Sequence, residues 1–201
     1  MFNTLTRMGA SGAGDYEIKR ALRFRRDSGS GNGTYLSRTS SNSDTYTLSM
    51  WIKRSMAHFD HNIWMIFFDS SGSNQSGDNS GLTFIRYGGK FQVDAHISGG
   101  GTASQSTSQY LDTSAWYHFV YQNNSNVGTF YINNELIPFS GAVTCFPLGD
   151  GTNETVIGRR HDSYYPFDGY MADVHLVDGS IVAPSSFAET NESTGQWVPK
   201  K

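Results

Sequence analysis

The chain has little from which to build crosslinks or membrane spans. Cys145 is the single cysteine among 201 residues, so no internal disulfide can form. No segment approaches the ~20 apolar residues of a membrane-spanning helix, and the N-terminal M-F-N-T-L-T-R-M-G lacks the apolar run of a signal peptide. These absences predict synthesis in a reducing cytoplasm, without export or membrane insertion. For Cys145 we expect the role of a small buried hydrophobe.

Sequence patterns of hydrolytic enzymes are also missing. A glycosidase needs two carboxylates about 5–9.5 Å apart, but the nearest alternating acids, Asp15 and Glu17, lie close to the N-terminus. There is no G-x-S-x-G elbow for a serine nucleophile. Cys145 has no neighbouring His or Asn that would activate it. The sequence therefore predicts a protein that is not an enzyme.

Metal-binding patterns are weak. His58 and His61 have a suitable spacing but no second ligand pair. Asp150, Asn153 and Glu154 could ligate calcium through oxygen atoms, although D-G-T-N-E matches no calcium loop. We expect no cofactor, with calcium as the alternative.

What the chain does contain is turn formers and aromatics. It has 22 glycines and 14% aromatic residues, whereas only 37% of the residues are apolar. Gly, Ser, Asn and Thr form turns, while Tyr, Phe and Trp favour strands. The composition, without a visible break, predicts one all-β domain with many loops.

Around a dozen short strands are expected. They cover residues 22–24, 34–37, 45–53, 63–68, 82–87, 90–97, 116–122, 128–132, 135–137, 155–158 and 170–177. In the third, the alternating residues Tyr46, Leu48, Met50 and Ile52 should share a buried face. Gly88-Gly89 and Asn133-Asn134 should form hairpin turns, and residues 98–108 read as a loop. Regularly spaced strands of this kind predict two packed antiparallel sheets, an antiparallel β-sandwich.

The segment at 157–179 is the most informative. Alternation places Tyr170, Ala172, Val174 and Leu176 on one strand face and Met171, Asp173, His175 and Val177 on the other. A loop precedes this strand and contains Arg159, Arg160, His161, Asp162, Tyr164 and Tyr165. Sugars offer an apolar C–H face and a ring of hydroxyls, which aromatic, Arg and Asp side chains can bind. These six residues are our candidate glycan-binding site; packing under the loop and protein contacts are the alternatives.

Charge is unevenly distributed. Residues 1–26 contain six basic and two acidic residues, a net +4, whereas the remainder contains nine basic and sixteen acidic residues, a net −7. Residues 1–16 read as a flexible or partner-ordered arm, and residues 17–201 as the sandwich domain. The candidate anchoring residues are Arg7, Lys19, Arg20 and Arg23, with one charged edge strand as the alternative. No aromatic-interleaved basic groove appears elsewhere, so we expect no nucleic-acid binding. Near the C-terminus, Pro184 should start a helical turn and Trp197 should pack the tail against the body.

Several segments together resemble concanavalin A-like, laminin-G-like domains of tailed-bacteriophage virion proteins. The similar pieces include G-A-G-D-Y-E-I-K-R-A-L-R-F at 12–24, T-Y-L-S-R-T at 34–39, T-Y-T-L-S-M-W-I-K-R at 45–54, A-W-Y-H-F-V at 115–120, F-Y-I-N at 130–133, residues 157–160 with 167–179, and A-P-S-S-F-A-E-T-N-E-S-T-G-Q-W-V-P at 183–199. The first and last pieces are the more phage-specific.

The resemblance implies a concanavalin A-like jelly roll on the virion surface, in a tail-fibre-like, adhesive protein attached through its N-terminal arm. A head (capsid) decoration protein is the alternative, and a polysaccharide-cleaving enzyme a distant one. Expected partners are other virion proteins, further copies of the chain in a homo-oligomer, and host-surface glycans. No calcium ligand of the family can be placed on this sequence.

Overall fold

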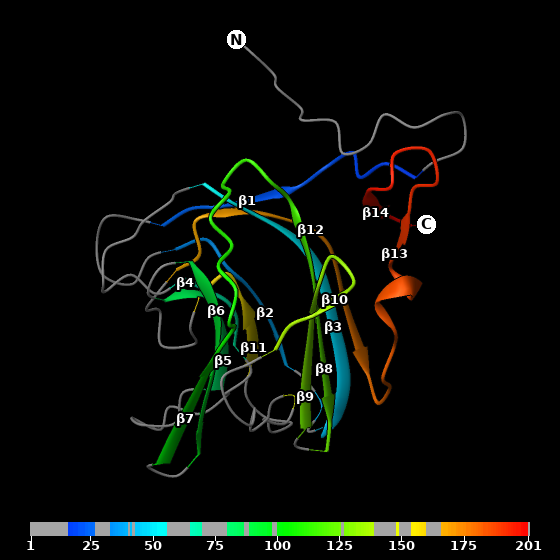
Figure 1. Ribbon diagram of the computed structural model, residues 1–201. Coiled ribbons are helices and arrows are strands. Elements are labelled where there is room, and N and C mark those ends of the chain that lie inside the picture. Colours follow the sequence, from blue (N-terminus) through cyan, green and yellow to red (C-terminus); the bar gives the residue numbers. More distant parts are fainter. Residues whose placement is uncertain are drawn as a thin grey trace.

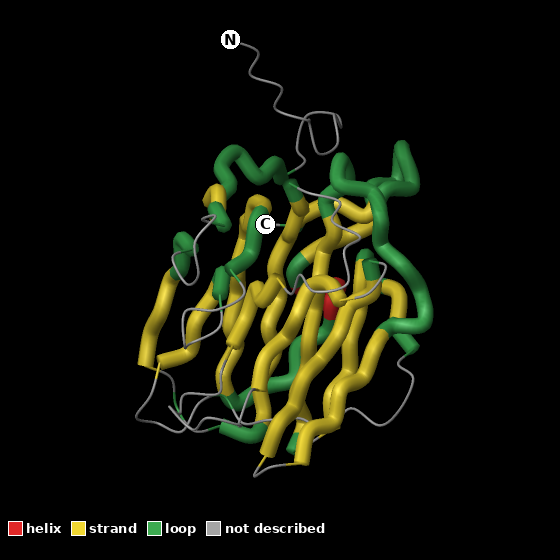
Figure 2. Tube along the Cα trace, turned by 90° about the vertical axis from the view of Figure 1, so that its left-hand side faces the viewer, coloured by secondary structure: helices red, strands yellow, loops and turns green. Residues whose placement is uncertain are grey.

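A computed structural model describes residues 16–26, 33–39, 41, 43–55, 65–69, 80–86, 89–97, 100–125, 127–138, 148, 154–159 and 166–200. Their strands form two six-stranded antiparallel sheets and one two-stranded hairpin. The two large sheets face each other as layers (Figures 1 and 2), which confirms the predicted sandwich. No helix in this part of the chain is both long and apolar enough to cross a membrane.

The first sheet has the order β1 (Leu22–Phe24), β12 (Gly169–Asp178), β3 (Thr45–Arg54), β8 (Tyr117–Asn124), β9 (Val127–Ile132), β10 (Glu135–Leu136). The second has the order β2 (Leu36–Thr39), β11 (Glu154–Ile157), β4 (Met65–Asp69), β5 (Ser80–Arg86), β6 (Lys90–Ile97), β7 (Gly100–Gln105). A 3-10 turn, η1 (Pro184–Ser186), leads to the hairpin of β13 (Ala188–Thr190) and β14 (Trp197–Pro199).

The main core lies on the inner face of the first sheet. Tyr46, Leu48, Met50 and Ile52 of β3 are all fully buried in it, as their alternation predicts. Aromatic rings from neighbouring strands complete the layer; for example, Tyr121 of β8 stacks on Phe130 of β9 with 4.6 Å between ring centroids. Offset rings of this kind add specific geometry to the hydrophobic burial.

The outer face of the same sheet carries a second, smaller cluster. Trp51 of β3 and Ala172 of β12 pack there against Ala188, Trp197 and Ile18. The C-terminal hairpin and the N-terminal segment therefore cover this face together. The expectations for Trp197 and for a helical turn at Pro184 are confirmed.

Several turns follow the sequence closely. Asn133 and Asn134 have φ angles of 49° and 69°, the left-handed pair that joins β9 to β10 in a tight hairpin. The β5–β6 hairpin is also confirmed, with Gly89 at φ 81°. The expected loop at 98–108 is wrong, because β7 pairs with β6 over Gly100–Gln105. The sequence G-G-T-A-S-Q contains no apolar alternation that would predict a strand, whereas the pairing of β7 with β6 consists of backbone hydrogen bonds.

The strict alternation expected along β12 is also wrong. Pairing with β3 shifts register between Ala172 and His175, and Asp173 has φ 46°. This bulge inserts an extra residue. Met171 and Leu176, expected on opposite faces, therefore both pack against the main core, while Ala172 faces the outer cluster.

Candidate functional site

The candidate loop joins one sheet to the other. It leaves the second sheet after β11 and enters the first sheet at β12. Arg159 is described, whereas Arg160, His161, Asp162, Tyr164 and Tyr165 lie outside the described residues. At the base of the loop, the Phe167 N–H donates a 2.7 Å hydrogen bond to the Gly158 carbonyl. The two ends of the loop are thus fixed side by side.

Close packing surrounds this base. Phe24 of β1 meets Phe167 edge to face, with 6.1 Å between ring centroids. Gly158 has φ 98°, and a Cβ there would lie 2.4 Å from Phe24 and 2.8 Å from the Thr34 carbonyl oxygen. A Cβ on Gly33 would lie 2.2 Å from that of Pro166. The loop therefore starts and ends on a rigid platform, as a recognition loop requires.

Arg159 lies over the ring of Tyr35, a residue that is not among the six site residues predicted from the sequence. Its guanidinium carbon lies 3.4 Å from the centroid of the Tyr35 ring. Pairing of β2 with β11 brings the two together, since Leu36 lies opposite Ile157. Tyr35 is 42% exposed. The available sequence signal was its place in T-Y-L-S-R-T, but only the strand pairing connects that segment to Arg159.

The basic residues expected to anchor the chain have different surroundings. Lys19 and Arg20 are exposed on an extended segment before β1, and Arg7 lies outside the described residues. Arg23 forms a 2.7 Å ion pair with Asp168 and lies 5.0 Å from the Tyr170 ring centroid. Arg23 thus contributes to holding β1 beside the end of the loop.

The candidate metal ligands give no assembled site in the described part of the chain. No group of three or more His, Cys, Asp or Glu side chains gathers there. Glu154 is exposed at the start of β11, whereas His58, His61, Asp150 and Asn153 lie outside the described residues, as does Cys145.

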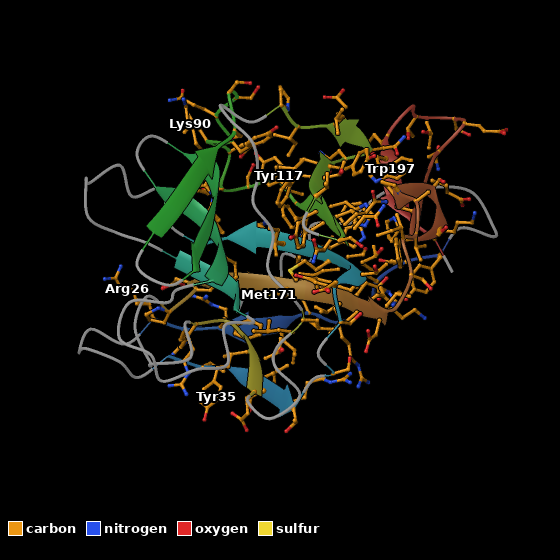
Figure 3. All side chains as sticks on the ribbon, turned by 90° about the horizontal axis from the view of Figure 1, so that it is seen from below. Arg26, Tyr35, Lys90, Tyr117, Met171 and Trp197 are labelled. Atoms are coloured by element: carbon orange, nitrogen blue, oxygen red, sulfur yellow. The ribbon has the colours of Figure 1, made fainter. Side chains whose placement is uncertain are left out.

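The loop platform and the covered outer face lie far apart. Figure 3 places Tyr35 and Trp197 on opposite sides of the molecule. The face that receives the C-terminal hairpin is therefore separate from the edge that carries Arg159 and Tyr35.

Comparison with solved structures finds a similar fold in several proteins, two of them solved with a bound sugar. Domain 4 of the extracellular GH43 arabinanase AbnA from Geobacillus stearothermophilus, solved with arabinotriose, superposes with a TM-score of 0.54 at 19% identity, covering 72% of this chain and 65% of that one. The CBM40 of the Ruminococcus gnavus IT-sialidase, bound to α2,3 sialyllactose, gives 0.54 at 13% identity over 72% and 80%. Mouse laminin α1 domains LG4-5 give 0.52 at 10% identity over 80% and 41%. The chain spans less than two thirds of the arabinanase domain and of the laminin fragment. At these identities the similarity concerns the fold.

The sequence itself identifies the family. No curated protein matches the chain significantly. The laminin G family model described as "Concanavalin A-like lectin/glucanases superfamily" matches residues 27–184. This range contains most of both large sheets. The protein therefore belongs to the concanavalin A-like lectin/glucanase superfamily and has its laminin-G-like jelly-roll fold.

Proposed function

We propose that this protein is a non-catalytic carbohydrate-binding domain whose site is the 159–166 loop together with Tyr35. The observation that carries the proposal is the Arg159 guanidinium 3.4 Å from the Tyr35 ring centroid, on the clamped base of that loop. The fold shared with a sialidase CBM40 and an arabinanase domain supports it.

This arrangement suits a sugar in two ways. Arg159 covers one face of the Tyr35 ring, so the C–H face of a pyranose packs on the part of the ring that remains exposed. The guanidinium beside it donates hydrogen bonds in a fixed plane to hydroxyl or carboxylate oxygens. Asp162, Tyr164 and Tyr165 supply further groups of both kinds in the same loop. Because the base is rigid, little conformational freedom is lost there on binding.

A glycan array with matched tyrosine variants tests the site. Tyr35→Ala and the double variant Tyr164→Ala, Tyr165→Ala should each lower binding about tenfold or more, since each removes a stacking surface. Tyr16→Ala is the control, because Tyr16 is 36% exposed and contacts Asp173 on the other sheet. Equal glycan binding by all four proteins, or by none above background, contradicts the proposal.

The absence of catalysis has its own test. Incubation of the purified protein with host and environmental polysaccharides should release no reducing ends. Hydrolysis that exceeds the buffer blank would identify an enzyme and overturn this part of the proposal.

We further propose that the protein is displayed on the surface of a tailed-phage virion, as a tail-fibre-like adhesin attached through its N-terminal arm and repeated in a homo-oligomer. The phage-like segments at 12–24 and 183–199 and the net +4 charge of residues 1–26 support this assignment. The exposed Lys19 and Arg20 remain available for an acidic partner surface.

Particle incorporation tests the attachment. Deleting residues 1–20 should abolish incorporation into phage particles while leaving the domain folded by circular dichroism. Normal incorporation contradicts the anchoring role. Immunogold labelling should mark the tail; labelling of the head would favour the alternative, a capsid decoration protein.

A further inference from the structure

An open cavity lies between the two sheets, at the side where the described strands of both sheets end. β1 pairs only with Gly169 to Met171 of β12, so the following part of β12 has β3 as its single described neighbour. β2 is the last strand of the other sheet. The space between these edges has a volume of about 270 Å³.

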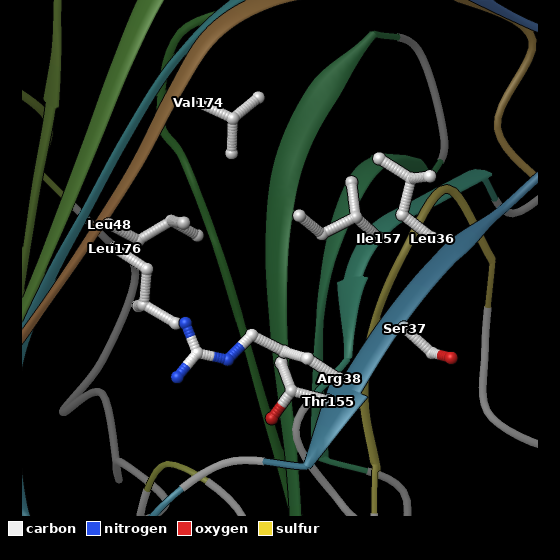
Figure 4. Close-up of a pocket in the computed structure, with 8 residues that line it drawn as sticks. All are labelled: Leu36, Ser37, Arg38, Leu48, Thr155, Ile157, Val174 and Leu176. Carbon is white, nitrogen blue, oxygen red and sulfur yellow. The ribbon is translucent and has the colours of Figure 1, made fainter.

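Apolar side chains from both sheets line the cavity (Figure 4). Leu48, which is fully buried, belongs to the main core, whereas Val174 and Leu36 are 37% and 49% exposed. Ile157 and Leu176 complete the apolar wall. Protein interiors contain few voids larger than a water molecule, whose share of liquid volume is ~30 Å³. An opening of this size therefore offers room for a ligand.

One cation lines this apolar space. Figure 4 shows the side chain of Arg38, an exposed residue, extending from β2 toward Leu176, and both residues line the cavity. Within the described part of the chain, this guanidinium has no hydrogen-bond or ion-pair partner. A guanidinium is a planar fork of donors that matches a carboxylate.

The nearby acid does not neutralise this guanidinium by contact. The Ser41 hydroxyl donates a hydrogen bond to Asp178 and is the main reason that the pKa of that carboxyl is lowered. Arg38 lowers the same pKa only as a smaller, through-space effect. The donors of Arg38 thus remain available to a ligand.

We propose that this cavity binds a medium-chain aliphatic carboxylate. The chain lies between Leu48, Val174, Leu176 and Ile157, and the carboxylate accepts hydrogen bonds from Arg38. The volume is just below the ~300–1,000 Å³ of ordinary ligand sites, which favours a single short chain over a multi-ring ligand. Neither Arg159 nor Tyr35 lines this cavity, although Leu36 and Ile157 belong to the same two segments, so the two proposals are tested separately.

Titration with decanoate, followed by calorimetry and by methyl NMR shifts of the lining leucines and valines, tests the proposal. Wild-type protein should bind decanoate in the micromolar to low millimolar range. Decanol, which lacks the charge, should bind about tenfold more weakly, and acetate, which lacks the alkyl chain, should show no measurable binding, because burial of the CH₂ groups supplies most of the binding free energy. Decyl sulfate distinguishes a carboxylate site from a general anion site. Binding of decyl sulfate as tight as that of decanoate would overturn the assignment to a carboxylate.

Three variants locate the binding. Arg38→Gln should weaken decanoate about tenfold and leave decanol unchanged, since the charge-assisted hydrogen bonds are lost. Val174→Phe should fill the cavity and abolish binding of both. Val127→Phe is the matched control, because Val127 is 64% exposed on β9 and lines no part of the cavity.

Circular dichroism and thermal melts verify that each variant is folded. The proposal is overturned if the wild type shows no saturable decanoate binding. It is also overturned if Arg38→Gln and Val174→Phe both bind decanoate as tightly as the wild type. Loss of glycan binding in Tyr35→Ala with normal decanoate binding supports two independent sites.

Discussion

At the scale of single residues, Gly158 combines two demands that only glycine meets. Its φ of 98° lies in a region that L side chains avoid, and Phe24 and the Thr34 carbonyl oxygen occupy the space of a Cβ. It also provides the carbonyl that closes the 159–166 loop. The geometry of the candidate site therefore depends on the glycine at the base of the loop.

Gly158→Ala should lower the free energy of unfolding by about 2–4 kcal/mol, since backbone strain and overpacking add. Gly195→Ala separates the two causes, because Gly195 has φ 69° but a Cβ there would meet no atom within 4 Å. The control should lose only ~1 kcal/mol. Urea unfolding measures both, and equal losses in the two variants would contradict the packing argument.

His118 is a buried polar residue, and both of its ring nitrogens form hydrogen bonds. The Trp197 indole N–H, which can only donate, donates a 2.9 Å hydrogen bond to His118 Nδ1. Nε2 therefore carries the proton and donates to the Ser49 hydroxyl at 2.9 Å. Burial, with a smaller contribution from His175, lowers the pKa of His118 from 6.5 to about 4.

This shift predicts a pH dependence of stability. Because the folded pKa lies below the unfolded one, the unfolded state binds more protons between pH 6.5 and 4. The contribution of the neutral His118 ring to the free energy of unfolding is complete above pH 6.5. It is lost as the pH falls toward 4, by up to about 3 kcal/mol.

Unfolding free energies at pH 7 and 4.5 should therefore fall less in His118→Gln than in the wild type. Comparison of the two proteins removes the contribution of carboxylates common to both. An identical decrease in both would show that His118 does not carry the dependence.

At the scale of elements, the bulge in β12 decides which side chains reach the core. Asp173 takes φ 46°, a conformation that Asp and Asn tolerate and that β-branched residues avoid. Its carboxylate also accepts a 3.3 Å hydrogen bond from Tyr16. The bulge allows Met171 and Leu176 to pack in the same core.

Asp173→Val should destabilise the protein by about 1–3 kcal/mol, since valine resists the left-handed conformation. Asp173→Asn should remain within ~0.5 kcal/mol of the wild type, because asparagine tolerates that conformation and can still accept a hydrogen bond. Thermal or urea unfolding of the pair measures the difference. A valine variant as stable as the asparagine variant would mean that β12 can lose its bulge freely.

The elements also show what the sequence can and cannot predict. Alternation along β3 identified the apolar face that packs in the main core, because the pattern lies within one strand. It did not predict that Thr47, Ser49 and Trp51 on the other face are buried as well. The bulge at Asp173 and the pairing of β7 could not be predicted from the sequence, because both depend on backbone hydrogen bonds with a neighbouring strand. The same limit hid Tyr35, which meets Arg159 only through the pairing of β2 with β11.

At the scale of the whole molecule, the first sheet is assembled from distant parts of the chain. β12 lies between β1 and β3, with Met171 opposite both Leu22 and Ile52. Such long-range pairing forms late, since large loops must close first. The central layer therefore needs almost the entire sandwich sequence.

A chain ending at residue 168 should lack cooperative unfolding, because removing β12 exposes β3 and opens the main core. A chain ending at residue 182 keeps β12 and loses only η1 and the C-terminal hairpin. It should unfold cooperatively at a lower midpoint. Near-UV circular dichroism during urea titration distinguishes them, and a cooperative transition in the shorter chain would contradict this account.

The N-terminal segment and the C-terminal hairpin cover the same outer face of the first sheet, which matters for attaching the protein to a surface. Ile18 and Trp197 belong to the same cluster, and Trp197 lies on the opposite side of the molecule from Tyr35 (Figure 3). A tag fused before residue 16 or after residue 200 would hold the domain by one face. Immobilised on a sensor through either tag, the molecule would present its Arg159–Tyr35 edge to the solution in the same orientation.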